Sequence, residues 1–296
     1  MKYVTVTLNP TVDRMYRLSV PFKTGGLNRT EEMSEISYSG KGINVSRELK
    51  NLGVNSDMMC ILRGSVGEEA YKSFIEEGLS PVEIKTSGRL RTNISIIDSE
   101  GLDTEINECG EPLEFDAVLK FLALYDKTIS SDEKKVVVVS ASTPPGFRND
   151  IYKMLIFNAK KNNSYTVLDA DGELLKQGLE AGPSLIKPNE HELSLLTGCA
   201  LEGSENEVRL KALAAASAIY EKTGVEVLCT LGSKGSIFVG EEGQFVCPAK
   251  KANIKRFKGA GDMFLARFLF ERFENKRSIF DAMRIASDKT AENLEK

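Results

Sequence analysis

The second half of the chain alternates between short apolar runs, which predict strands, and longer amphipathic runs, which predict helices. The clearest strand is KKVVVVS at residues 134–140, because a run of valines is typical of a strand buried on both faces. Further strands are predicted at YTVLDA, SLIKPN, EVLCTLG and SIFVG, and helices over about 114–129, 149–162 and 205–222, from His191 and from about Asp262. Strands followed by helices at this spacing indicate an α/β fold with a mostly parallel sheet covered on both faces.

Two segments interrupt this rhythm, because they show polar–apolar alternation without a helical period. Residues 14–38 predict two antiparallel strands, and residues 88–109 predict a β-hairpin that turns at Ser99-Glu100-Gly101. We expect the two segments to pair into one small sheet. The predicted division is therefore an α/β core of residues 1–13, 39–87 and 110–296 beside a small sheet of residues 14–38 and 88–109.

Composition narrows the class of function. A formal net charge of −4 and a pI near 5.4 leave no basic footprint for nucleic acid. Five scattered cysteines without a CxxC pair argue against a disulfide framework and a structural zinc site. With no signal region and no apolar run of bilayer length, we expect a cytoplasmic protein without a membrane partner. The single histidine, His191, has no second histidine with which to hold a metal, and we interpret it as a surface helix residue.

The segment GAGD places a glycine turn and a carboxylate at the start of a predicted helix. Backbone amides at a helix N-terminus bind anions, and glycines let a phosphate approach the backbone. Asp262 would then accept a proton from a hydroxyl that attacks the phosphorus. The alternative is a helix cap after a tight turn. Phe264 stands where a dinucleotide fingerprint needs its third glycine, and the chain contains no GxxxxGK[ST] motif.

Two segments of the first half supply polar groups for a small ligand. SGKGINV contributes two glycines, a cation and an amide just ahead of a predicted helix: Gly40, Gly42, Lys41 and Asn44. This set suits a polyhydroxylated or phosphorylated ligand, or else forms a glycine turn capped by Asn44. In LNPTVDR, Asn9 and Asp13 follow the first strand, at the edge where open α/β sheets bind ligands. Asp13 either accepts hydrogen bonds from sugar hydroxyls or caps a turn.

Two later segments allow a nucleotide site and an ordinary structural interpretation alike. In KPNEHEL, Asn189 and Glu192 have capping-box spacing, and they also suit a metal–phosphate complex with Lys187 opposing the phosphate charge. TLGSKGSIFV predicts either an ordinary hairpin or a floor for a purine or phosphate. Its residues of interest are Thr230, Gly232 and Gly235.

Six blocks in this order resemble the PfkB or ribokinase-like family of sugar kinases, and the resemblance covers nearly the whole chain. The blocks are TLNPTVDR, SGKGINVSRELKNLG, GRLRTNISI, LDADGELLKQGLEAGPSLIKPNEHEL, TLGSKGS and GAGD. TLNP and SGKGINV are most similar to the branch that phosphorylates fructose 1-phosphate or tagatose 6-phosphate. The resemblance implies a three-layer α/β/α core with a small β-sheet lid, and a kinase that uses ATP and Mg²⁺. Family members often pair through the lid, so we expect a homodimer.

The resemblance also implies roles for single residues. Asp262 is expected to be the catalytic base, and the amides of Gly259, Ala260 and Gly261 an anion hole. The sugar-binding positions are Asp13, Gly40, Lys41 and Asn44. Arg91 is expected to hold the phosphate already on the substrate, with Arg29 and Arg89 as further candidates. The nucleotide side is expected to use Lys187, Asn189, Thr230, Gly232 and Gly235, with Glu192 acting on magnesium indirectly.

The chain departs from the family pattern at several positions. Phe257 and Met263 replace the Thr and Ser expected near GAGD, and Arg267 replaces a small residue. Ala141 stands where glycine is usual, and the sequence ends at Lys296, where more helix is expected beside the adenine pocket. Phe257, Met263 and the early end favour an alternative function, that of a non-catalytic sugar-phosphate sensor, whereas the intact Asp262 and the glycines of the anion hole favour a kinase.

Overall fold

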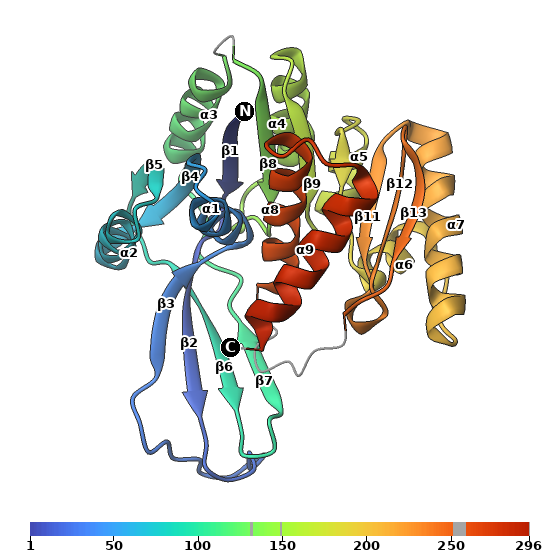
Figure 1. The fold of residues 1–296 in the computed structure, drawn as a ribbon. Coiled ribbons are helices and arrows are strands. Elements are labelled where there is room, and N and C mark those ends of the chain that lie inside the picture. The colour runs from blue at the N-terminus through green and yellow to red at the C-terminus, as the bar shows by residue number, and fades with distance from the viewer. Residues whose placement is uncertain (131–132, 149, 251–258, 296) are drawn as a thin grey trace.

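The computed structural model describes residues 1–130, 133–148, 150–250 and 259–295. A nine-stranded sheet forms the centre of the molecule, in the order β13-β12-β11-β10-β9-β8-β1-β4-β5 (Figure 1). Its strands are β1 (Lys2–Thr7), β4 (Ser56–Arg63), β5 (Ser80–Thr86), β8 (Lys135–Ser140), β9 (Tyr165–Asp169), β10 (Leu185–Ile186), β11 (Glu226–Thr230), β12 (Ser236–Gly240) and β13 (Gly243–Cys247). All neighbours are parallel except the two pairs made by β12. The expected mostly parallel sheet is therefore confirmed.

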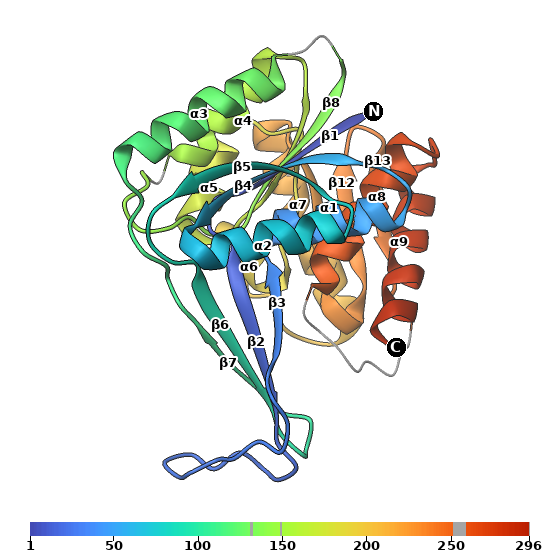
Figure 2. The same cartoon turned by 90° about the vertical axis from the view of Figure 1, so that its left-hand side faces the viewer.

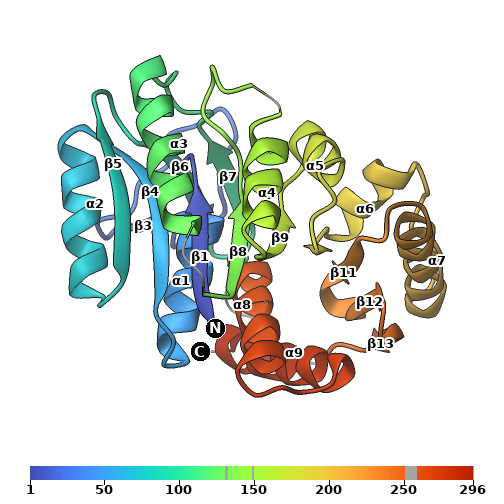
Figure 3. The same ribbon diagram turned by 90° about the horizontal axis from the view of Figure 1, so that it is seen from above.

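Helices cover both faces of this sheet, as Figure 3 shows from above. One layer contains α3 (Phe115–Ile129), α4 (Ile151–Lys161), α5 (Gly172–Leu179), α6 (Glu190–Thr197) and α7 (Glu205–Thr223). The other contains α1 (Lys41–Asn51), α2 (Gly64–Glu76), α8 (Ala260–Phe273) and α9 (Ile279–Leu294). Along β8 the valines alternate between the layers: Val137 and Val139 pack against the first, Val136 and Val138 against the second. This two-sided burial explains the uninterrupted apolar run.

A second sheet of four strands extends from the edge at which β1 ends (Figures 1 and 2). Its order is β3-β2-β6-β7, from β2 (Thr11–Arg17), β3 (Glu35–Ser39), β6 (Arg91–Ile97) and β7 (Asp103–Asn107). β2 pairs antiparallel with β3 and parallel with β6, and β6 and β7 form the expected hairpin. β2 begins at Thr11, whereas the predicted small sheet begins at residue 14.

The sequence patterns do not predict four elements, namely β4, β5, α5 and β13. Two helices also begin earlier than expected. α1 starts at Lys41, so Asn44 lies inside its first turn and is not its cap. α8 starts at Ala260, two residues before the predicted start at Asp262. In the part of the chain described here, no helix is both long and apolar enough to cross a membrane.

Candidate active site

The glycines of SGKGINV bring the start of α1 against the ends of β1 and β8. A Cβ atom on Gly40 would lie 2.5 Å from Cγ2 of Thr7, and one on Gly42 would lie 2.9 Å from the carbonyl oxygen of Val6. Side chains are therefore excluded at both positions by close packing. In the strand order, β1 stands between β8 and β4. β4 and β5 are added on one side of β1 and the later strands from β8 onward on the other, so β1 lies at the point where the strand order reverses. Open α/β sheets bind ligands outside the carboxyl ends of the strands at such a point.

Asp262 lies in the first turn of α8, close to this edge. Gly259 precedes the helix with a φ of 80°, in the left-handed region that glycine adopts readily, and no side chain caps the helix. The first amides of a helix have no partner within it, so those of the glycine turn are available to an anion. Asp262 is not the cap. Its Oδ2 accepts a hydrogen bond from Nδ2 of Asn44 at 2.8 Å, and only 7% of the residue is exposed.

Two lysines and a completely buried carboxylate adjoin Asp262. Asp169, at the end of β9, has its Oδ1 2.9 Å from Nζ of Lys41 and its Oδ2 3.1 Å from Nζ of Lys187. A Cβ atom on Gly261 would lie 3.6 Å from Nζ of Lys187, so this ammonium group faces the glycine turn. The sequence reasoning misses Asp169. Its signal is an aspartate at the carboxyl end of the apolar strand YTVLDA.

Burial and the charges of this cluster together set the pKa of Asp262. Burial raises the pKa of Asp262 to about 6, with a further contribution from the negative charge of Asp169, while Asn44 and the two lysines oppose the shift. Burial disfavours the charged form of Lys41, but the carboxylates of Asp169 and Glu192 outweigh it and hold the pKa of Lys41 above its ordinary value. Asp262 is thus mostly ionised at neutral pH, and its pKa lies close enough to neutrality to suit a general base.

The KPNEHEL segment forms the capping box that its spacing predicts. Asn189 Oδ1 accepts from the amide of Glu192, and Glu192 Oε2 accepts from the amide of Asn189, both at 2.8 Å. Its other oxygen, Oε1, lies 3.9 Å from Nζ of Lys41. Burial raises the pKa of Glu192 despite this cation. The structural interpretation of this motif is therefore confirmed, and the same residues adjoin the lysine cluster.

The TLGSKG turn lies beside this capping box. Asn189 forms an isolated parallel bridge with Thr230, whose amide donates to the carbonyl of Pro188 at 3.1 Å. Gly232 has open space where a side chain would be, whereas a Cβ atom on Gly235 would lie 2.2 Å from the carbonyl oxygen of Cys247. The strand–turn–strand interpretation is confirmed, and the turn has an open face at Gly232.

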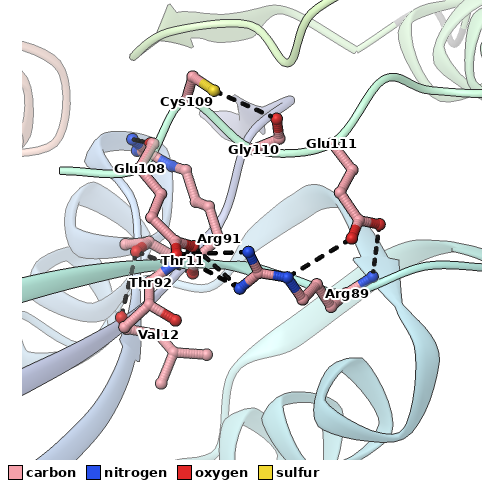
Figure 4. A network of polar contacts seen from close by, with 9 residues as sticks. All are labelled: Thr11, Val12, Arg89, Arg91, Thr92, Glu108, Cys109, Gly110 and Glu111. Atoms are coloured by element: carbon pink, nitrogen blue, oxygen red, sulfur yellow. Dashed lines mark hydrogen bonds and ion pairs between the residues drawn. The ribbon is translucent and has the colours of Figure 1, made fainter.

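Arg91, on β6, extends from the four-stranded sheet back to the core. Its Nε donates to the carbonyl of Asn9 at 3.1 Å and its Nη1 to that of Glu108 at 3.2 Å. Figure 4 shows it beside Arg89, whose guanidinium lies between Glu108 and Glu111. Both arginines line a hollow of about 230 Å³. Because Arg89 already has two carboxylate partners, Arg91 is the better placed cation for a phosphate.

Asp13, another predicted sugar-side residue, lies close enough to Arg91 for its charge to oppose the lowering of that guanidinium's pKa by burial. Asp13 lies on β2 and accepts a hydrogen bond from Oγ of Ser39 on β3. Arg29 is exposed in the long connection between β2 and β3. Its predicted contact with the substrate phosphate remains a prediction.

The departures from the family pattern have local explanations where the structure describes them. Arg267 forms an ion pair with Glu48 of α1. Met263 contacts Asn293 of α9, which donates to its sulfur at 3.5 Å. Ala141 adopts a φ of 76°, where glycine is favoured, which explains the usual glycine there. Phe257 lies outside the described residues.

Similarity to known proteins places this site in a family. Residues 6–291 match the sequence pattern of the family described as "pfkB family carbohydrate kinase". The chain belongs to the pfkB family of carbohydrate kinases. It is 32% identical to the 1-phosphofructokinase of Bacillus subtilis over 90% of this chain and 84% of that protein. Membership implies phosphoryl transfer from ATP, and it confirms the family that the six sequence blocks indicate.

Solved structures of the pfkB type agree with the fold. A possible 1-phosphofructokinase from Thermotoga maritima superposes with a TM-score of 0.86 and 25% identity, covering 100% of this chain and 92% of that one. Phosphofructokinase-2 of Escherichia coli in complex with substrates and products gives a TM-score of 0.89 at 24% identity, covering 99% and 93%. The three-layer core with a smaller sheet is therefore the family fold.

Proposed function

We propose that this protein transfers the γ-phosphoryl group of ATP to the free primary hydroxyl of fructose 1-phosphate, giving fructose 1,6-bisphosphate and ADP. The observation that carries the proposal is the pairing of Asp262 with an uncapped glycine turn at the start of α8. The choice of substrate follows the relatives with similar sequences, which are 1-phosphofructokinases. Tagatose 6-phosphate is the other substrate to test, because it too has a phosphate at one end and a free primary hydroxyl at the other.

The substrate phosphate is held by Arg91 in this proposal. Two of its five N–H groups donate to backbone carbonyls, and these hydrogen bonds fix the plane of the guanidinium. The remaining donors suit two oxygens of one phosphate. Asp13, Gly40, Lys41 and Asn44 surround the sugar. Closure of the lid sheet, residues 14–38 and 88–109 in the proposed division, excludes water, which would otherwise accept the phosphoryl group.

The transfer itself needs a base and an anion site. The sugar hydroxyl attacks the γ-phosphorus in line, its proton passes to a carboxylate oxygen of Asp262, and the bond from phosphorus to the leaving oxygen of ADP breaks. The amides of Gly259, Ala260 and Gly261 stabilise the charge on the transferring group. Lys187 faces this turn and opposes the phosphate charge. The nucleotide extends over Asn189, Thr230, Gly232 and Gly235.

Magnesium fits the site through the phosphates. No three side chains of His, Cys, Asp or Glu in the described ranges are grouped so as to hold a metal ion. Mg²⁺ commonly keeps several waters and binds substrate phosphates with one or two carboxylates, and Glu192 is the candidate. When bound, such an ion would supply positive charge that offsets the charge of the phosphates.

We propose that two copies pair through the lid sheets. The lid carries several exposed large apolar side chains, which are Val20, Leu27, Met33, Ile36, Leu102 and Ile106. β3 and β7 are the edge strands of the lid sheet, and covering such edges and apolar side chains is favourable. A second copy related by a two-fold axis presents the same apolar side chains to the first. Sedimentation or light scattering of the wild type and of Ile36→Glu would test this, with a monomeric wild type contradicting it.

The test of the proposed function is ADP release from Mg-ATP with four sugars in parallel: fructose 1-phosphate, tagatose 6-phosphate, fructose 6-phosphate and fructose. We expect turnover with fructose 1-phosphate and none with unphosphorylated fructose. Turnover with tagatose 6-phosphate alone would contradict fructose 1-phosphate as the substrate and assign tagatose 6-phosphate in its place. Binding of a sugar phosphate without any turnover would overturn the proposal and favour the sensor function.

A further inference from the structure

We propose that Arg47 is a positioning residue, which fixes the side-chain amide of Asn44 so that its N–H group is directed at Asp262, and which ties this arrangement to the lid. The inference rests on the proposed function, because it concerns the base of that reaction. Arg47 lies on α1, three residues after Asn44, where side chains of one helix face meet.

The orientation of Asn44 follows from the chemistry of its two neighbours. An amide group can present either its oxygen or its N–H₂ group in a given direction. Nη1 of Arg47 lies 3.1 Å from Oδ1 of Asn44, and a guanidinium only donates hydrogen bonds. The oxygen must therefore face Arg47, which leaves Nδ2 to donate to Oδ2 of Asp262 at 2.8 Å. In the reversed orientation, an amide oxygen would face the carboxylate and an N–H₂ group would face the guanidinium.

Arg47 is itself held by two further elements. Its Nε lies 2.5 Å and its Nη2 3.2 Å from the two carboxylate oxygens of Glu77, directly after α2. Such a two-point contact fixes the plane of the guanidinium. Nη2 also donates to the carbonyl of Tyr38 at 3.1 Å. Tyr38 lies on β3 of the lid sheet, one residue before that strand ends at Ser39. A displacement of β3 therefore acts on the same group that orients Asn44.

The charges facing Asp262 come from several elements. Asp169 on β9, Lys187 after β10 and Lys41 on α1 all act on its pKa, and the hydrogen bond from Asn44 lowers it. Loss of the Asn44 orientation removes this hydrogen bond and leaves the lysine and aspartate charges in place. The pKa of Asp262 then rises, and less of the base is ionised at a given pH.

The test compares Arg47→Met with the wild type and with the control variant Arg272→Met. Arg272 pairs with Glu242 and lies in the last turn of α8, at the other end of the helix from Asp262. We expect kcat to fall about tenfold in Arg47→Met with little change in the KM for the sugar phosphate, since one hydrogen bond to a charged group is lost. The acid limb of kcat/KM should move to higher pH, because the hydrogen bond from Asn44 lowers the pKa of Asp262. Arg272→Met should leave both unchanged.

Two further measurements separate positioning from general damage. In the background Asn44→Ala, adding Arg47→Met should change kcat little, because the two residues act as one unit. Additive losses would overturn the inference. If Arg47→Met fails to fold, Glu77→Gln should give a smaller shift of the acid limb in the same direction, and an unchanged limb would again count against it.

A measurement without turnover keeps the inference separate from the proposed function. In protein labelled with ¹⁵N at asparagine, the side-chain resonance of Asn44, assigned by its loss in Asn44→Ala, should follow the titration of Asp262 near pH 6. In Arg47→Met this titration should be lost or shifted upward. Identical titrations would overturn the positioning role even if the wild type is an active kinase. Absence of turnover in the wild type would overturn the function and leave this comparison decisive.

Discussion

Nη2 of Arg267 on α8 lies 2.5 Å from Oε1 of Glu48 on α1, and the two side chains are only 13% and 5% exposed. Arg267 follows Asp262 by five residues on α8, and Glu48 follows Asn44 by four residues on α1. Two polar contacts, Asn44 with Asp262 and Glu48 with Arg267, therefore join the same two helices. A buried charge left without its partner is strongly unfavourable. We therefore expect Arg267→Met to lower the free energy of unfolding by about 3 kcal/mol, measured by urea denaturation at pH 7.

The partner variant makes this prediction specific. Replacing both members, in Glu48→Met with Arg267→Met, should recover most of the lost stability, because apolar groups of similar size can replace a buried ion pair. If the double variant loses the sum of the two single losses, the pair is not the reason for the effect.

The conformation of Ala141 predicts a stabilising substitution. A φ of 76° costs an alanine about 1–2 kcal/mol, and glycine avoids that cost at the expense of a more flexible unfolded chain. Ala141→Gly should therefore raise the free energy of unfolding by about 0.5 kcal/mol. The control is Ala214→Gly, in the interior of α7 and exposed, which should lower it by about 1 kcal/mol. A loss of stability in both would contradict the strain at Ala141.

Much of the fold could be predicted from the sequence because its signals are local. The valine run of β8 and the hairpin turn after β6 are read from neighbouring residues alone. β5 escapes prediction because SPVEIKT contains a proline and two charges, and it forms through its parallel pairing with β4.

The site was less accessible to sequence reasoning for a related reason. Asp262, Lys41 and Lys187 stand in glycine- or proline-marked motifs, whereas Asp169 is one carboxylate among 43 acidic residues. Its importance comes from complete burial between two lysines that are distant in the sequence. The hydrogen bond between Asn44 and Asp262 likewise joins residues 218 positions apart, which no local pattern reveals.

The lysine cluster predicts a pH-dependent loss of stability. Burial opposes the charge of Asp169, but Lys187 and Lys41 outweigh it and hold the pKa of Asp169 below its ordinary value. A depressed pKa contributes stability that is present above the unfolded value, about 4, and is lost as the pH falls below it. Lys187→Met should therefore cost about 3 kcal/mol at pH 7 and less near pH 4. The exposed Lys176→Met is the control, and an equal small loss in both variants would contradict the account.

The pKa of Asp262 predicts the acid side of the activity profile. A base with a pKa of about 6 is ionised above that pH and protonated below it, so kcat/KM should fall as the pH drops through 6. A sugar phosphate also titrates at about pH 6, so the decisive comparison is between proteins. Asn44→Ala removes a hydrogen bond that lowers the pKa of Asp262, and its limb should lie at higher pH. Superimposable limbs would show that the substrate alone titrates.

The most direct test of the account is the turnover of Asp262→Asn with fructose 1-phosphate and Mg-ATP, measured beside its affinity for the sugar phosphate. The substitution keeps the size of the side chain and an oxygen that can accept from Asn44, but it removes the base. We predict a loss in kcat of at least ~100-fold with only a modest change in sugar-phosphate affinity. Turnover equal to that of the wild type would contradict the role of Asp262 and with it the proposed mechanism.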